Sequence, residues 1–186
     1  MELEEYKEWI KQNANQEEVM AYEVAKRIIK YHTMYNDDCE VSCFPRKILT
    51  KDRERIEFDL VVKLEMIGKR TTTRLIGIEF KEWDIKKVIL QAIVRRQFVD
   101  YMYIATRIVS LDYVDLFQLA YFGIGWIVFD EDDNFVKIIV PARFSYSNST
   151  LHLIKEIIRS SIEEIVKEEV EEKLKELPLS KFGLGV

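Results

Sequence analysis

The chain has 186 residues, a formal net charge of −5, 48% hydrophobic residues and 33% charged residues. This length and composition predict one soluble globular domain with a sizeable core and exclude a disordered chain. The negative charge excludes a protein that coats nucleic acid nonspecifically, whereas binding of nucleic acid at a single site depends on the local field around that site. No apolar run approaches the roughly 20 residues of a membrane span, and the acidic residues 1–6 do not resemble a signal peptide. We therefore expect a cytoplasmic protein without a membrane partner, in which Cys39 and Cys43 are reduced thiols.

Two helices are predicted before the first strand. Residues 1–13 form a short charged helix or arm, and residues 15–32 form a second helix. Helical spacing gives the second helix one apolar face, made of Met20, Ala21, Val24, Ala25, Ile28 and Tyr31. Glu17 lies near the middle of this face, whereas Glu18 and Glu23 lie on its flanks. Two interpretations of Glu17 stay open: its charge stabilises the positive end of the helix macrodipole, or its side chain points inward toward a metal site.

Three strands follow, and the second and third carry the charged residues of interest. Residues 39–44 predict an edge strand that ends at Pro45. Residues 55–65 and 76–81 predict two strands, and the turn signal at Gly68 between them makes these strands antiparallel neighbours.

Side-chain alternation predicts where the charges of these two strands lie. One face of the strand at 55–65 is apolar and consists of Ile56, Phe58, Leu60, Val62 and Leu64. Asp59 lies on the other face, and in the next strand Glu79 and Lys81 leave the same side of the sheet. Pairing of the two strands therefore brings two carboxylates and an amine together at one sheet end.

The rest of the chain alternates between helical and strand periodicity. The predicted elements are a helix at 84–98, a strand at 100–106, a helix at 112–121 and strands at 123–130 and 135–140. A strand, a helix and a strand in this order predict a crossover to a parallel partner. We expect an α/β fold in residues 1–148, with a central mixed β-sheet flanked by helices. Residues 149–177 predict a long C-terminal amphipathic helix, so that residues 149–186 pack on the core or on a partner subunit.

Two carboxylates and an amine at one sheet end suit a divalent cation and an attacked phosphate. Mg²⁺ prefers hard oxygen ligands and usually takes only one or two carboxylates from a protein, which Asp59 and Glu79 would supply. Lys81 would hold the attacking water or offset charge in the transition state. In the alternative interpretation, Glu79 and Lys81 line an exposed sheet face as weak ion pairs.

The order of these residues also resembles a known family. Asp59, then Glu79-Phe80-Lys81 on the next strand, then a helix that bears Gln91-Ala92, is similar to the PD-(D/E)XK nuclease superfamily with its restriction-endonuclease-like core. The resemblance covers about residues 17–140. The chain departs from the motif's name at one position, because Phe58 precedes Asp59 where the motif has proline.

The resemblance implies a role for each matching residue. Asp59 and Glu79 match the metal ligands, the carbonyl of Phe80 matches a frequent backbone ligand, and Lys81 matches the catalytic lysine. Glu17 matches an acidic residue on the first core helix. The motif glutamine has two candidates: Gln91, which we favour because Ala92 follows it, and Gln97, which with Tyr101 fits the spacing of the RecB-like branch.

Four basic residues near this stretch offer contacts to phosphates, namely Lys86, Lys87, Arg95 and Arg96, although a solvated helix face explains any one of them equally well. We expect Trp83 to pack at the helix start rather than to stack on a base.

These expectations add up to a Mg²⁺-dependent deoxyribonuclease, with Mn²⁺ as a substitute, that acts on duplex or branched DNA as a homodimer. The alternative is a non-catalytic nucleic-acid-binding or assembly module that retains the nuclease fold. A hydrolase of glycans is disfavoured because it leaves Lys81 without a role.

Overall fold

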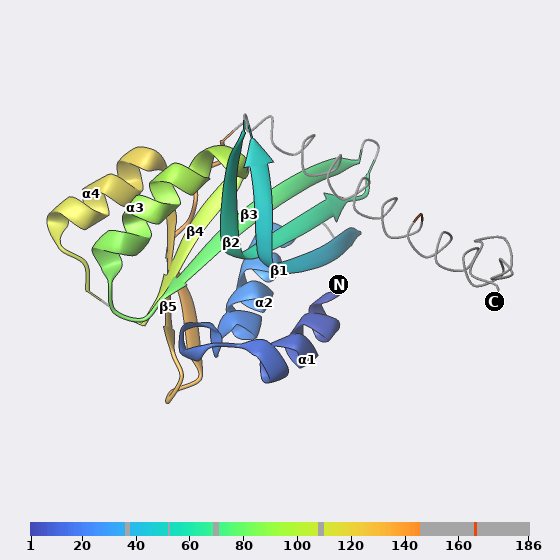
Figure 1. Cartoon of the computed structure of the whole chain (residues 1–186), viewed down its shortest axis with the longest axis horizontal. Coiled ribbons are helices and arrows are strands. Elements are labelled where there is room, and N and C mark those ends of the chain that lie inside the picture. The colour runs from blue at the N-terminus through green and yellow to red at the C-terminus, as the bar shows by residue number, and fades with distance from the viewer. Residues whose placement is uncertain (36–37, 52, 69–70, 108–109, 146–165, 167–186) are drawn as a thin grey trace, which may run out of the picture. The chain divides into compact units, whose positions relative to one another are not determined.

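A six-stranded mixed sheet with the strand order β1-β2-β3-β4-β5-β6 forms the centre of the computed structural model (Figure 1). The structure describes residues 1–35, 38–51, 53–68, 71–107, 110–145 and 166. The strands are β1 (Cys39–Lys51), β2 (Glu54–Met66), β3 (Thr72–Lys81), β4 (Tyr101–Thr106), β5 (Gly125–Asp130) and β6 (Phe135–Val140). Strands β3, β4 and β5 run parallel to one another, and the other neighbouring pairs are antiparallel.

Helices cover both faces of this sheet. They are α1 (Leu3–Asn13), the 3₁₀ turn η1 (Gln16–Glu18), α2 (Ala21–His32), α3 (Ile85–Arg95), the 3₁₀ turn η2 (Arg96–Phe98) and α4 (Tyr113–Phe122). Helices α1 and α2 pack on the face that carries Ile76, Ile78 and Phe80 of β3, whereas α3 packs on the opposite face (Figure 1). The predicted α/β fold with a central mixed sheet flanked by helices is confirmed, as is the parallel pairing of the strands on either side of α3.

The chain divides into two units, residues Met1–Thr150 and Leu151–Val186. The long amphipathic helix expected over 149–177 lies outside the described residues, except for the helical and exposed Val166. Among the described residues, none of the helices combines the length and the apolar character needed to cross a bilayer.

The segment expected to be one helix from residue 15 to residue 32 is divided. The side chain of Asn15 accepts hydrogen bonds from the backbone of Glu17 and Glu18, and the Glu18 carboxylate accepts one from the Asn15 N–H. This capping box starts the short turn η1, and α2 begins only at Ala21. The predicted apolar face of the helix is buried except for Tyr31, which is 42% exposed.

Strand β1 does not end at Pro45 as the sequence predicted. Pro45 pairs with Leu60 and Lys47 pairs with Phe58, so the position between them, Arg46 opposite Asp59, leaves the ladder without any shift in register, and Arg46 has a φ of 47°. The positive φ is a local irregularity without an extra residue in either strand, and the preceding proline is tolerated because β1 is an edge strand. The strand then continues to Lys51, which makes β1 and β2 a long antiparallel pair.

Phe58 departs from the alternation expected along β2. Leu60, Val62 and Leu64 belong to the core beneath α1 and α2, but the Phe58 ring lies against Gly77 and 6.5 Å from the centre of the Phe98 ring. A β-carbon on Gly77 would lie 2.6 Å from that ring, so only glycine leaves room for it. The ladder between β2 and β3 ends at the pair of Leu60 and Ile78, and β2 separates from β3 beyond this point.

Candidate active site

The site lies where β2 and β3 separate, one residue past the last ladder pair. There the Oδ2 of Asp59 accepts a hydrogen bond of 2.8 Å from the Phe80 N–H, and the Glu79 carboxylate takes a hydrogen bond from the backbone of Asp59. Each carboxylate therefore accepts a hydrogen bond from a backbone N–H of the opposite strand. These N–H groups lie just beyond the last backbone–backbone pair of the two strands. The two strands, and with them Asp59 and Glu79, are brought together as the alternation predicted.

Glu79 is almost completely buried, with 2% of its surface exposed. Burial raises the pKa of its carboxyl from an ordinary value of 4.5 to about 9, and the negative charge of Asp59 adds to this shift. Its Oε1 atom has no hydrogen-bond partner among the described residues. At neutral pH this carboxyl therefore holds a proton unless a cation takes the proton's place.

Arg95, the last residue of α3, is the cation next to this carboxyl. Its Nε lies 2.9 Å from Glu79 Oε1, but the N–H points to the backbone oxygen of Glu57 and donates a hydrogen bond of 3.0 Å there. The positive charge of Arg95 lowers the pKa of Glu79, but burial and the negative charge of Asp59 outweigh it. Arg95 supplies charge to Glu79 without a hydrogen bond.

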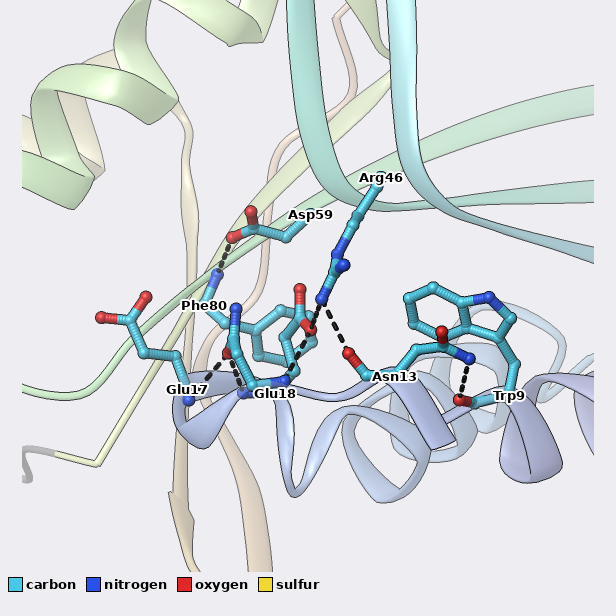
Figure 2. Close-up of polar contacts among 8 residues, drawn as sticks. Trp9, Asn13, Glu17, Glu18, Arg46, Asp59 and Phe80 are labelled. Carbon is cyan, nitrogen blue, oxygen red and sulfur yellow. Dashed lines mark hydrogen bonds and ion pairs between the residues drawn. The ribbon is translucent and has the colours of Figure 1, made fainter. Parts of the chain in front are cut away.

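Asp59 lies among further acidic groups. Burial raises its pKa first, the Phe80 N–H lowers it, and the charges of Glu18 and Glu17 raise it again. Figure 2 shows the side chain of Asp59 beside the backbone of Phe80, with Glu17 and Glu18 of η1 near the same peptide. Four carboxylates thus surround one end of β3.

Glu17 and Lys81 form the most exposed part of this arrangement. The Lys81 Nζ lies 2.5 Å from Glu17 Oε1, and their side chains are 21% and 34% exposed. Glu17 lies in the first turn of η1 and also contacts the end of β3, so both interpretations of its role stay predictions. The ammonium of Lys81 is held at the sheet end by a residue from η1.

Sequence reasoning missed Glu18 and Arg46. Glu18 is 4% exposed, and its Oε2 lies 3.0 Å from Nη2 of Arg46, which also donates 2.8 Å to the carbonyl of Asn13 (Figure 2). The Arg46 guanidinium lies 5.3 Å from the Trp9 ring centre, in cation–π contact. The spacing Asn15-x-x-Glu18 was the available signal, because it is typical of a capping box and marks a helix start.

The structure separates the two glutamine candidates. Gln91 is half-buried on α3 one turn before Arg95, so both residues lie on the same helix face. Because α3 runs back along the sheet from the end of β3, Gln91 lies nearer than Arg95 to the Lys81 end of that strand. Gln97 lies in η2, where its Nε2 is 3.4 Å from Glu54 Oε2. The choice of Gln91 over Gln97 stays a prediction.

The four expected phosphate contacts fall into two pairs. Lys86 and Lys87 are exposed in the first turn of α3, at the same sheet edge as Lys81. Arg95 instead contacts Glu79, and Arg96 directs its guanidinium to backbone carbonyls, those of Val99, Asp100, Phe122 and Arg143. We therefore leave Arg95 and Arg96 out of the surface offered to nucleic acid.

Trp83 was expected to pack at the start of α3, and that expectation is wrong. Its side chain is 66% exposed, just beyond the end of β3. The ring is therefore available to a ligand at this edge.

Comparisons of the chain with models of protein families, with curated proteins and with solved structures found no match. What this site does must therefore be inferred from its own geometry.

The donor set fits a small divalent cation. Glu79 offers a buried oxygen without a hydrogen bond, Asp59 offers a second carboxylate beside it, and the peptide of Phe80 adjoins both. The part of the chain that the structure describes contains no group of three or more His, Cys, Asp and Glu side chains arranged as metal ligands. A Mg²⁺ site needs no such group, because this ion keeps several waters and takes one or two carboxylates.

Proposed function

We propose that the chain is a metal-dependent nuclease of the restriction-endonuclease-like PD-(D/E)XK class that hydrolyses phosphodiester bonds in DNA. One observation carries the proposal: the buried Glu79 oxygen lacks a hydrogen bond and lies beside a second carboxylate. Burying two neighbouring carboxyls opposes folding, and a divalent cation is the partner that compensates for it while also serving catalysis.

In this proposal Asp59, Glu79 and the Phe80 carbonyl hold Mg²⁺, for which Mn²⁺ can substitute. The ion would supply Lewis-acid stabilisation of the attacked phosphate and a water of lowered pKa. Lys81, held by Glu17, orients the attacking water or offsets charge in the transition state. Gln91 flanks this arrangement from α3.

The proposed substrate surface lies at the sheet edge around the ends of β3 and α3. Lys86 and Lys87 are exposed there and would contact phosphates without reading sequence. The exposed ring of Trp83 would stack on a base or a sugar. We propose duplex or branched DNA as the substrate and a homodimer as the active form, because two-fold pairing presents one site to each strand.

We place this activity in the cytoplasm. Cys39 and Cys43 are both free thiols in the structure, as suits a reducing compartment.

A second function has its own supporting observation. The guanidinium of Arg95 lies 2.9 Å from Glu79 and supplies a positive charge where the first proposal needs a metal. A module that binds nucleic acid or assembles with other proteins, and that has exchanged its metal for Arg95, would contain the same contact.

The deciding experiment is cleavage of labelled DNA with Mg²⁺ or Mn²⁺. The substrates are linear duplex, single-stranded, circular and four-way-junction DNA, and the proteins are wild type, Lys81→Ala and Asp59→Ala. We expect cutting that requires metal and is lost in both variants. Lys63→Ala is the matched control, because Lys63 pairs with Glu65 on β2 away from the site. A folded wild type that cuts none of these substrates would favour the non-catalytic module.

A further inference from the structure

Arg95 occupies an unusual position for an arginine at the end of a helix. Its side chain is only 17% exposed, and it lies against Glu79, whose side chain is 3% exposed. The backbone oxygen of Glu57 accepts a hydrogen bond from its Nε–H, and its positive charge acts on Asp59 as well as on Glu79. One half-buried guanidinium therefore serves the same two carboxyls that we propose as metal ligands.

The contact between Arg95 and Glu79 is electrostatic and incomplete. The hydrogen on Nε is committed to Glu57, so Glu79 Oε1 stays without a hydrogen bond although a cation is 2.9 Å away. Most arginine–carboxylate pairs satisfy the oxygens with one or two N–H groups. Here a positive charge lies beside the carboxyl pair while the lone pairs of Oε1 stay open to another ligand.

We propose that Arg95 is the resident counter-ion of this site, which stabilises the carboxyl pair before metal binds and weakens the affinity for the divalent cation. This inference rests on the proposed function, because it concerns the same metal ligands. Two positive partners on one buried carboxylate repel each other, and this repulsion is strong where water is excluded. Arg95 thus sets how much free metal the protein needs.

The structure gives this inference a specific consequence for substitutions. Arg95→Gln keeps a donor near Glu57 and removes the charge beside Glu79. The metal-free variant should then unfold at a lower temperature than wild type. Among the described residues, Arg95 is the positive partner of Glu79 Oε1, and the variant loses this contact. Its affinity for metal should rise at the same time. If Arg95 had a purely structural role, the unfolding temperature would fall but the affinity for metal would not rise.

The test is direct measurement of Mn²⁺ and Mg²⁺ binding by titration calorimetry, together with thermal unfolding at increasing metal concentration. We expect Arg95→Gln to bind metal about tenfold more tightly than wild type and to gain more in unfolding temperature on saturation. Arg95→Lys keeps the charge and should bind metal within about threefold of wild type. This second variant keeps the test informative if Arg95→Gln folds only with metal.

Arg107→Gln is the matched control. Arg107 follows β4 and pairs with Glu82 at 3.3 Å and Asp132 at 3.1 Å, so its loss removes the same charge from the chain without touching Glu79. We expect its metal affinity to stay near that of wild type.

Three outcomes would overturn the inference, and a fourth would overturn the proposed function as well. Equal or weaker metal binding by Arg95→Gln would mean that Arg95 only positions Glu79. An equal gain in Arg107→Gln, or a tenfold gain in Arg95→Lys, would mean that the specific charge contact is not responsible. If neither wild type nor Arg95→Gln bound metal, the proposed nuclease function itself would fail.

Discussion

The ammonium of Lys81 lies 2.5 Å from the carboxylate of Glu17, although the two residues are 64 positions apart in the chain. Glu17 belongs to the short turn η1 and Lys81 is the last residue of β3. The amine that we propose as catalytic is therefore aimed by a segment outside the sheet. We therefore expect a substitution of Glu17 to affect the rate of cleavage more than the stability of the fold.

Glu17→Gln should lower kcat about 10- to 100-fold with little change in KM, because the substitution loosens the lysine that acts in the transition state. Stability should change by less than about 1 kcal/mol, since the pair is partly exposed. Steady-state cleavage kinetics and urea unfolding measure both effects. Glu23→Gln on α2 is the control, and an unchanged kcat in Glu17→Gln would remove Glu17 from the mechanism.

Glu79→Gln should change how stability depends on pH in metal-free protein. The pKa of Glu79 is about 9 in the folded chain against an ordinary value of 4.5, so between these values folded Glu79 keeps a proton that the unfolded chain releases. Wild-type stability should therefore fall as pH rises through this range, whereas the amide that replaces the carboxyl in the variant does not titrate. We expect the variant's advantage to grow by about 2–4 kcal/mol from about pH 5 to about pH 8 in urea unfolding with EDTA. Parallel curves for the two proteins would contradict the burial of a protonated Glu79.

Glu18→Ala should lower the free energy of unfolding by about 2 kcal/mol, because it removes a buried partner of Arg46 and the capping bond to Asn15 together. Arg46→Ala should cost less, since the Arg46 side chain is 43% exposed. Urea midpoints compare the two variants, with Glu23→Ala as a control on the neighbouring helix. A larger loss in Arg46→Ala than in Glu18→Ala would show that the Trp9 and Asn13 contacts matter more than the ion pair.

Gly77→Ala should lower stability by about 1–3 kcal/mol, because the added β-carbon would lie 2.6 Å from the ring of Phe58. Cleavage should fall as well, since Phe58 precedes Asp59 and its displacement moves a proposed metal ligand. The double variant Phe58→Leu with Gly77→Ala should recover part of both losses. Additive losses in the double variant, measured by thermal unfolding, would mean that the ring and the glycine do not act together.

The sequence predicted the strands β2 and β3 and the placement of their charges well. The reason is that apolar and charged residues alternate visibly along the sequence of a strand. The turn signal at Gly68 also makes the two strands neighbours. The meeting of Asp59 and Glu79 followed from this pairing alone. The helix after β3 was equally visible, because its apolar residues change to helical spacing at once.

The errors concern places where a distant residue decides the local structure. Glu18 was placed on a flank because residues 15–32 were read as one helix, whereas η1 is a separate turn in which the Glu18 carboxylate contacts Arg46 and the Asn15 N–H. The position of Arg95 depends on Glu57 and Glu79, and no spacing within α3 reveals them. The end of β1 was misjudged because an edge strand tolerates a proline that an inner strand would not.

The irregularity at Pro45 and Arg46 in β1 has a consequence for how this protein behaves in concentrated solution. A 13-residue edge strand would present a long row of backbone donors and acceptors to any passing chain, and such rows start aggregation. Pro45 has no N–H, and the positive φ of Arg46 turns the strand at the next residue. The row of backbone donors and acceptors along β1 is therefore interrupted near its middle. Each of the two remaining segments is short, which disfavours pairing with a strand of another molecule. The same irregularity that directs Arg46 to Glu18 also protects the exposed border of the sheet from intermolecular pairing.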